Sequence, residues 1–185
     1  MTTKRVAIFI DGSNFFHKLR ELGLVNLTKF NYKGLVDSLV SDGSVSYYGY
    51  YIGVVRAKEG DVRGQVLRRN QQRSFAHLES QGQCFMVKRG TVMENGGVYH
   101  EKGVDVGLAV DLLVGAYENS YDKALVISSD TDLVPAIRKV VALKKEIEYV
   151  GFAHLPSLGM QKYATRSRLL ILEDLKKFEA PSLVV

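Results

Sequence analysis

Cysteine is almost absent from this 185-residue sequence, in which Cys84 is the only one. A single cysteine excludes an intramolecular disulfide, a zinc site built from several thiolates and a two-cysteine redox motif. Any metal ion must therefore be bound by oxygen or imidazole ligands. Proline occurs only three times, which argues against a proline-rich or low-complexity chain.

Long apolar runs are also missing. None approaches the ~18–20 residues that span a bilayer, and Asp11 follows a run of only five apolar residues, 6–10, too short for a signal-peptide core. We therefore expect no membrane contact and a cytoplasmic location. With 46% hydrophobic and 24% charged residues, the chain has the composition of a globular protein, and its length predicts one domain, residues 1–185. The oligomeric state is left open, with a homo-oligomer among the options.

The net charge of +5 is unevenly distributed along the chain. Residues 62–93 carry six basic and one acidic side chain, residues 101–132 carry two and seven, and residues 133–168 carry seven and two, so that the local charges are +5, −5 and +5. The total favours a polyanion partner only weakly, but an acidic stretch lies between two basic ones.

Short apolar runs alternate with segments of helical spacing. The runs predict strands at 6–10, 46–55, 84–88, 123–128, 147–152 and 169–172, and residues 89–99 predict a hairpin with its turn at 95–97. Helices are expected after a cap at Ser13 or Asn14 and at 33–41, 60–81, 104–117, 133–143, 155–163 and 173–178. This alternation predicts a three-layer α/β/α sandwich with a mainly parallel, Rossmann-like central sheet.

Two of the predicted strands end in acid-rich turns. These turns contain Asp11, Ser13 and Asn14 after the first strand, and Ser129, Asp130, Thr131 and Asp132 after the strand at 123–128. If the two strands are parallel neighbours, their carboxylates converge at one sheet edge, where ligands bind in such folds. Clustered carboxylates repel unless a cation lies between them, and oxygen ligands favour Mg²⁺ or Mn²⁺.

The helix at 104–117 adds further candidates. Asp105 lies in its first turn, next to Lys102, and is a fourth candidate ligand. Asp111 is a weaker fifth, because six residues at ~100° each place it about 120° around the helix from Asp105. Each acid also has a structural explanation: Asp130 can cap a helix, Asp132 can favour a helix dipole, and Asp11-Gly12 can form a turn.

The sequence as a whole resembles the NYN domain, the LabA-like branch of the PIN-domain nucleases. The resemblance covers roughly residues 5–175 and depends on three ordered motifs, FIDGSN, KGVD and YDKALVISSDTDLVPAIRK. It implies a PIN-like fold and metal-dependent ribonuclease activity on single-stranded or structured RNA. The family's acids and asparagine correspond to Asp11, Asn14, Asp105, Asp130 and Asp132. Two positions depart from the family pattern: Ser129 replaces a common glycine, and the tail carries Arg168 where an acid is expected.

The residues and the resemblance together suggest phosphodiester hydrolysis assisted by Mg²⁺ or Mn²⁺. The four aspartates Asp11, Asp105, Asp130 and Asp132 would bind one or two cations, and Asn14 would orient water or a phosphate oxygen. Substrate contacts are expected from Ser13, Lys102, Ser129 and Thr131, and from Arg69 and Arg73, which share one face of the basic helix at 60–81. These arginines can equally form a solvated helix face.

Other enzyme classes lack their motifs. The chain contains no GxxxxGK[ST] for a P-loop NTPase and no GxGxxG after the first strand for a dinucleotide-dependent oxidoreductase. A phosphoaspartate phosphatase would need a second aspartate where Ser13 stands. The main alternative is a catalytically weak or inactive PIN-like module that binds RNA without cleaving it.

Overall fold

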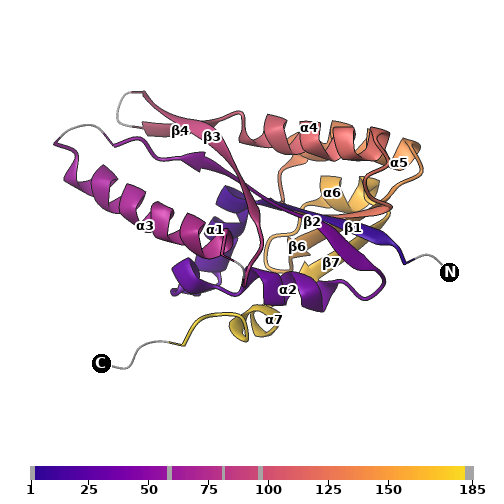
Figure 1. Cartoon of the computed structure of the whole chain (residues 1–185), viewed down its shortest axis with the longest axis horizontal. Helices are drawn as coiled ribbons and strands as arrows, with labels where there is room; N and C mark the ends of the chain where they lie inside the picture. Colours follow the sequence, from indigo (N-terminus) through magenta and orange to yellow (C-terminus); the bar gives the residue numbers. More distant parts are fainter. Residues whose placement is uncertain (1–2, 58–59, 81, 96–97, 182–185) are drawn as a thin grey trace.

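The computed structural model describes residues 3–57, 60–80, 82–95 and 98–181. Seven strands form one sheet in the order β4-β3-β2-β1-β5-β6-β7 (Figure 1). All neighbouring strands are parallel except β3 and β4, which are antiparallel. The strands are β1 (Arg5–Asp11), β2 (Ser44–Val54), β3 (Met86–Asn95), β4 (Val98–Lys102), β5 (Lys123–Ile127), β6 (Glu146–Phe152) and β7 (Arg166–Leu170).

Helices cover both faces of this sheet (Figure 1). Helices α1, α2 and α7 contribute to the core of one face, with the C-terminal end of α3, and α4, α5 and α6 contribute to the other. The helices are α1 (Gly12–Glu21), α2 (Tyr32–Leu39), α3 (Val62–Leu78), α4 (Val104–Tyr117), α5 (Val134–Ala142), α6 (Leu158–Tyr163) and α7 (Leu172–Lys176), with 3₁₀ turns η1 (Leu27–Lys29) and η2 (Thr131–Leu133). The predicted three-layer sandwich with a mainly parallel sheet is confirmed. No helix in the described ranges is long and apolar enough to cross a membrane.

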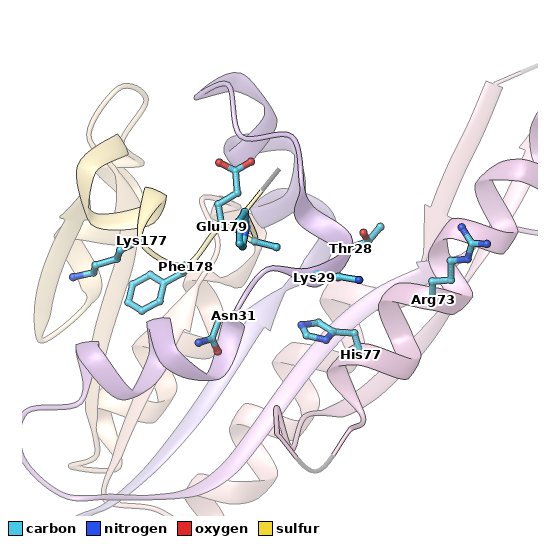
Figure 2. A pocket seen from close by; sticks show the side chains of 10 residues that line it. Thr28, Lys29, Asn31, Arg73, His77, Lys177, Phe178 and Glu179 are labelled. Carbon is cyan, nitrogen blue, oxygen red and sulfur yellow. The ribbon is translucent and has the colours of Figure 1, made fainter. Parts of the chain in front are cut away.

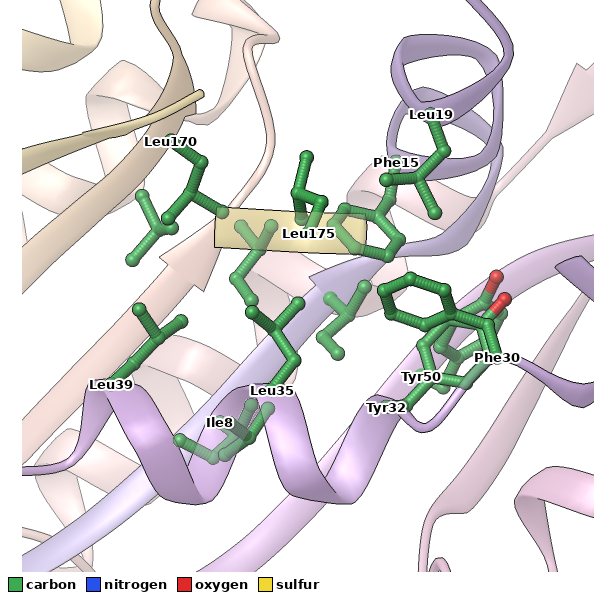
Figure 3. Close-up of a cluster of buried hydrophobic side chains, with 14 of the residues drawn as sticks. Ile8, Phe15, Leu19, Phe30, Tyr32, Leu35, Leu39, Tyr50, Leu170 and Leu175 are labelled. Atoms are coloured by element: carbon green, nitrogen blue, oxygen red, sulfur yellow. The ribbon is translucent and has the colours of Figure 1, made fainter. Parts of the chain in front are cut away.

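The central position of β1 in the sheet explains why its sequence is apolar without alternation. Ile8 and Ile10 belong to the core on the α1/α2 side (Figure 3), whereas Ala7 and Phe9 belong to the core under α4 and α5. A central parallel strand buries both of its faces, so successive side chains are all apolar until the strand reaches Asp11.

The connection from β1 to α1 differs from the prediction. The helix begins at Gly12, directly after the strand, and its cap is Asp11 rather than Ser13 or Asn14. Gly12 permits this tight connection, because a Cβ atom there would lie 2.3 Å from the Tyr50 ring and 2.9 Å from the Tyr51 carbonyl oxygen. The turn therefore requires glycine for close packing.

Other predicted boundaries move as well, and those of two strands have a clear structural reason. Strand β3 begins at Met86 rather than at residue 84, because Cys84 has a φ of 60°, which is incompatible with an extended strand. Strand β7 lies at Arg166–Leu170 rather than at 169–172, since this edge strand carries exposed polar side chains that obscure its apolar pattern. The predicted hairpin is present as β3 and β4, and residues 96–97 of its turn lie outside the described residues.

The order of the strands places a topological switch next to β1. The chain builds the sheet outward from β1 through β2 to β3 and β4, and α4 then returns it to the other side of β1, where β5 begins the second half. In open parallel sheets, ligands bind beyond the carboxyl ends of the strands at such a point. Here those ends are Asp11 and Ser128.

Candidate active site

The carboxyl ends of β1 and β5 lie side by side, as the sequence predicts. Ile10 pairs with Ile127 in parallel register, so the next residues of the two strands, Asp11 and Ser128, are neighbours. Both side chains are almost fully buried, at 4% and 1% exposure. The Ser128 hydroxyl donates a 2.8 Å hydrogen bond to Oδ2 of Asp11.

A second set of hydrogen bonds joins the two turns. Oδ1 of Asp11 accepts the backbone N–H of Asn14 at 3.0 Å, which caps α1. Oδ1 of Asn14 accepts the backbone N–H of Ser129 at 3.1 Å, and Oγ of Ser128 accepts the backbone N–H of Asp130 at 3.1 Å. The turn after β5 is therefore held against the start of α1.

The Asp130 carboxylate combines a structural contact with access to solvent. It caps η2, because its Oδ1 accepts the backbone N–H of Asp132 at 2.8 Å. Asp130 is only partly buried, and Asp132 is exposed. The expected capping role of Asp130 is thus present, and it occupies only one of the two carboxylate oxygens.

Helix α4 places two further acids on different sides. Asp105 lies, half-buried, in the first turn of α4, after the exposed Lys102 at the end of β4. Asp111 instead accepts the Tyr51 hydroxyl at 2.9 Å and lies 3.4 Å from the Lys88 ammonium. Asp111 therefore binds groups on β2 and β3, consistent with its rotation away from Asp105.

The charge of Asp111 also affects the tyrosines beneath α4. Tyr47 and Tyr51 share a 2.9 Å hydrogen bond between their hydroxyls. Burial is the main cause that raises the pKa of both phenols, and the nearby Asp111 carboxylate raises it further. Both tyrosines are therefore neutral at physiological pH, and Tyr51 holds α4 to the sheet as a hydrogen-bond donor.

The donor atoms at the carboxyl edge fit a hard divalent cation. Asp11 and Asp130 are linked through Ser128 and supply carboxylate oxygens. Oγ of Ser129 is buried and has no hydrogen-bond partner among the described residues, so an unsatisfied oxygen lies in the same turn. Mg²⁺ commonly binds one or two protein carboxylates and completes its shell with water and substrate phosphate. A pair of carboxylates is therefore a sufficient donor set.

The full set of predicted acids is not assembled around one point. Among the described residues, no three His, Cys, Asp or Glu side chains form a group that could hold a metal ion. The structure joins Asp11, Asn14, Ser129 and Asp130 by hydrogen bonds, whereas Asp132 and Thr131 are exposed on η2 and Ser13 is half-buried on α1.

The predicted substrate arginines lie on a different element. Arg69 and Arg73 are both exposed on α3, on the α1/α2 face of the sheet. Arg73 lines a cavity between α3 and the segment after α7, whereas Arg69 is not among the residues that line it. The two arginines lie one turn apart on α3, as the sequence predicts, but only Arg73 lines the cavity.

Ser128 is a residue of this site that the sequence analysis missed. Its hydroxyl is the link between Asp11 and the backbone of Asp130. The available signal was the strand register, since a polar residue that directly follows a buried strand and lies beside Asp11 needs a hydrogen-bond partner.

Comparison with known proteins identifies a family and supports the fold. The family model of the NYN domain matches residues 5–169. A crystal structure of a protein of unknown function from Vibrio parahaemolyticus superimposes with a TM-score of 0.69 at 18% sequence identity, covering 94% of this chain and 96% of that chain. At this identity the likeness shows the fold alone. The search of curated proteins gives no match.

Proposed function

The chain belongs to the NYN-domain family of PIN-like nuclease domains, and from this premise we propose that it is an endoribonuclease dependent on Mg²⁺ or Mn²⁺. One observation carries the proposal: at the switch point of the sheet, the buried Asp11 is hydrogen-bonded to Ser128, which in turn holds the Asp130 backbone. The buried Asp11 carboxylate would be a rigid ligand for the cation, and the partly exposed Asp130 carboxylate in the adjoining turn would leave an approach for substrate.

In this proposal Asp11 and Asp130 would be the principal ligands of the cation, and Asp105 and Asp132 would be additional ligands. A divalent cation supplies a more acidic water and stabilises negative charge that develops on the scissile phosphate. The protein's own contribution is to fix the ligands, and Asp11 is fixed best because each of its oxygens accepts a hydrogen bond.

The polar neighbours have positioning roles toward the phosphate. The Asn14 carbonyl oxygen is held by the Ser129 N–H, so its Nδ2 group remains as a donor for a phosphate oxygen. Ser13, Ser129 and Thr131 supply hydroxyl donors around the turn, and Lys102 supplies a cation at the start of α4. Arg69 and Arg73 contact the RNA backbone away from the scissile bond.

The test is cleavage of labelled single-stranded RNA and DNA by the purified protein, with Mn²⁺ or with EDTA. We expect internal cleavage of RNA that requires Mn²⁺ and is lost in Asp130→Asn. The matched control is Asp122→Asn, because Asp122 lies at the opposite end of β5 and binds Arg5. This control should keep the wild-type rate.

Two results of this assay would contradict the proposal. RNA binding without Mn²⁺-dependent cleavage by the wild-type protein would support the alternative of an inactive RNA-binding module. Cleavage that persists in Asp130→Asn would place the reaction elsewhere or in a contaminant.

A further inference from the structure

A cavity of about 830 Å³ lies on the α1/α2 side of the sheet (Figure 2), and neither Asp11 nor Asp130 lines it. Its walls come from η1, the C-terminal half of α3 and the segment that follows α7. We call it the basic groove and define it by the lining residues Lys29, Arg73, His77, Lys177, Phe178 and Glu179.

The three cations of the basic groove are not paired with a carboxylate in the described ranges of the chain. In the described part of the chain, Lys29, Arg73 and Lys177 form no hydrogen bond or ion pair through their side chains. Glu179 is directed to the backbone, since its Oε1 accepts the N–H groups of Val25 at 2.7 Å and Asn26 at 2.9 Å. Three cations against one carboxylate give the groove a formal charge of +2. A concave surface with uncompensated positive charge attracts a polyanion.

Aromatic groups accompany these cations. The Phe178 ring is half-buried and meets the edge of Phe30 with centroids 6.4 Å apart. The Lys177 ammonium lies 5.1 Å from the Phe178 ring centroid. Nε2 of His77 lies 2.9 Å from the Phe30 carbonyl oxygen and must donate to it, which fixes the imidazole in the wall. Cations beside an aromatic ring are the combination that binds phosphates and unstacked bases of a single strand.

Helix α1 connects the basic groove with the candidate active site. Its first turn carries Asn14, and the chain just beyond its last turn, at Val25 and Asn26, binds Glu179 of the groove. A helix of 10 residues spans ~15 Å at 1.5 Å per residue. Phe16 and Arg20 are exposed on α1 between the two ends, one turn apart. A short extended strand of nucleic acid can span this distance.

We propose that the basic groove binds a segment of single-stranded RNA away from the scissile bond, with phosphates at Arg73, Lys177 and Lys29 and a base against Phe178. This inference rests on the proposed function, because it assigns a second contact region to the same substrate. It favours single strands, since a base stacked in a duplex is not available to the Phe178 ring.

The test measures binding without cleavage. A fluorescein-labelled 12-nucleotide oligouridine is titrated with the full-length protein in EDTA, and anisotropy is recorded at several KCl concentrations. The test variant is Arg73→Gln with Lys177→Gln. The charge-matched control is Lys139→Gln with Lys176→Gln, because Lys139 lies exposed on α5 across the sheet and Lys176 lies exposed beside Lys177 outside the groove.

We expect the test variant to bind about tenfold more weakly than wild type, with the control unchanged. The slope of log affinity against log salt should fall by about 1.4 for two lost phosphate contacts. Phe178→Leu, which keeps an apolar side chain but removes the ring, should bind the oligouridine about fivefold more weakly, with the same salt dependence as wild type.

Three outcomes would overturn the inference: equal affinity of the test and control variants, no binding by wild type, or an equal loss of binding to labelled polyglutamate, which would indicate a surface for acidic proteins. The Mn²⁺ cleavage assay is independent of these measurements. If wild type does not cleave RNA but the test variant still binds it more weakly than the control, the proposed function is wrong and the groove assignment stands. If wild type cleaves RNA but the test variant binds it as tightly as the control, only the groove assignment is wrong.

Discussion

Asp11 has two separable roles at the end of β1. As a helix cap it accepts the Asn14 N–H, and asparagine can do the same at almost no cost. As a proposed cation ligand it needs its negative charge, which asparagine lacks. Asparagine keeps one acceptor oxygen for the cap, but its Nδ2 group replaces the oxygen that accepts the Ser128 hydroxyl, so Ser128 Oγ must accept from Nδ2 instead. Alanine removes the cap, the charge and every side-chain hydrogen bond to the buried Ser128 hydroxyl.

These two roles predict different thermal responses. In the absence of divalent cations, we expect the free energy of unfolding of Asp11→Asn to lie within about 1 kcal/mol of the wild-type value, and that of Asp11→Ala to be about 1–3 kcal/mol lower. Addition of Mn²⁺ should raise the melting temperature of wild type and of neither variant, because a ligand present at 100 times its dissociation constant stabilises by ~2.7 kcal/mol. A Mn²⁺-induced rise that survives in Asp11→Asn would contradict ligation by this carboxylate.

At the same scale, residue pattern alone left the roles of the acids open. Asp130 is a helix cap, as its sequence context allowed, and it also lies next to Ser128 in the site. Asp111 was a weak candidate ligand, and in the structure it accepts the Tyr51 hydroxyl and pairs with Lys88. Neither contact is visible from spacing along one helix, because both depend on which strands α4 crosses.

At the scale of elements, Arg5 and Asp122 hold β1 and β5 together at their amino-terminal ends. Asp122 accepts the Arg5 backbone N–H at 2.9 Å and its guanidinium at 2.8 Å, and the Asp122 N–H returns a bond to the Arg5 carbonyl. The hydrogen bonds from Arg5 lower the pKa of Asp122 to about 2. This contact fixes the register of the two strands whose opposite ends carry the site.

The lowered pKa of Asp122 predicts a dependence of stability on acid. A carboxylate with a depressed folded-state pKa stabilises the protein above its unfolded pKa of ~4, and this contribution is lost as the pH falls toward 2. In urea unfolding at pH 6, we expect wild type to have a higher free energy of unfolding than Asp122→Asn. This gap in unfolding free energy should narrow between pH 4 and pH 2. The gap is small because both side chains are about two-fifths exposed. A constant gap across this range would show that ionisation of Asp122 does not stabilise the fold.

Element types were predictable because β1 and β5 are short apolar runs and helices α1, α2 and α5 each carry a clear apolar face. The start of α1 moved because Gly12 packs against Tyr50 and Tyr51, which lie far along the chain, so local pattern cannot locate this contact. The start of β3 depends on the left-handed conformation of Cys84, whose N–H donates to the Ser80 carbonyl. This second constraint is local, but cysteine does not mark it in the sequence, because it rarely adopts a positive φ.

At the scale of the whole molecule, the two edges of the sheet have different chemistry. The carboxyl edge holds the four aspartates of the candidate site, from the buried Asp11 to the exposed Asp132, and without these four the protein has 16 acids against 25 bases, or +9. The amino edge instead holds charges that neutralise one another, including the nearly fully buried Lys123 and Glu148, 2.7 Å apart.

The buried pair also accounts for Arg168, which departs from the family pattern. Arg168 of β7 binds Glu148 of β6 at 2.9 Å, and Asp42 lies 3.1 Å from Lys123 of β5. The arginine in the tail thus completes an ionic network at the amino edge, and the sequence could not show this because the network joins residues far apart in the chain.

This separation of the edges predicts that stability and cleavage can be changed independently. Glu148→Gln leaves the Lys123 ammonium buried without its closest carboxylate and should destabilise the fold by about 3–5 kcal/mol. The double variant Lys123→Met with Glu148→Leu removes both buried charges and should recover most of that loss, because the remaining partners, Arg168 and Asp42, are partly exposed and can be hydrated. Urea unfolding measures both changes, and the Mn²⁺-dependent rate per folded molecule should match wild type in the double variant. A double variant as unstable as the single one would mean that the network supplies net stability, and a reduced rate per folded molecule would mean that the amino edge influences the site at the far ends of β1 and β5.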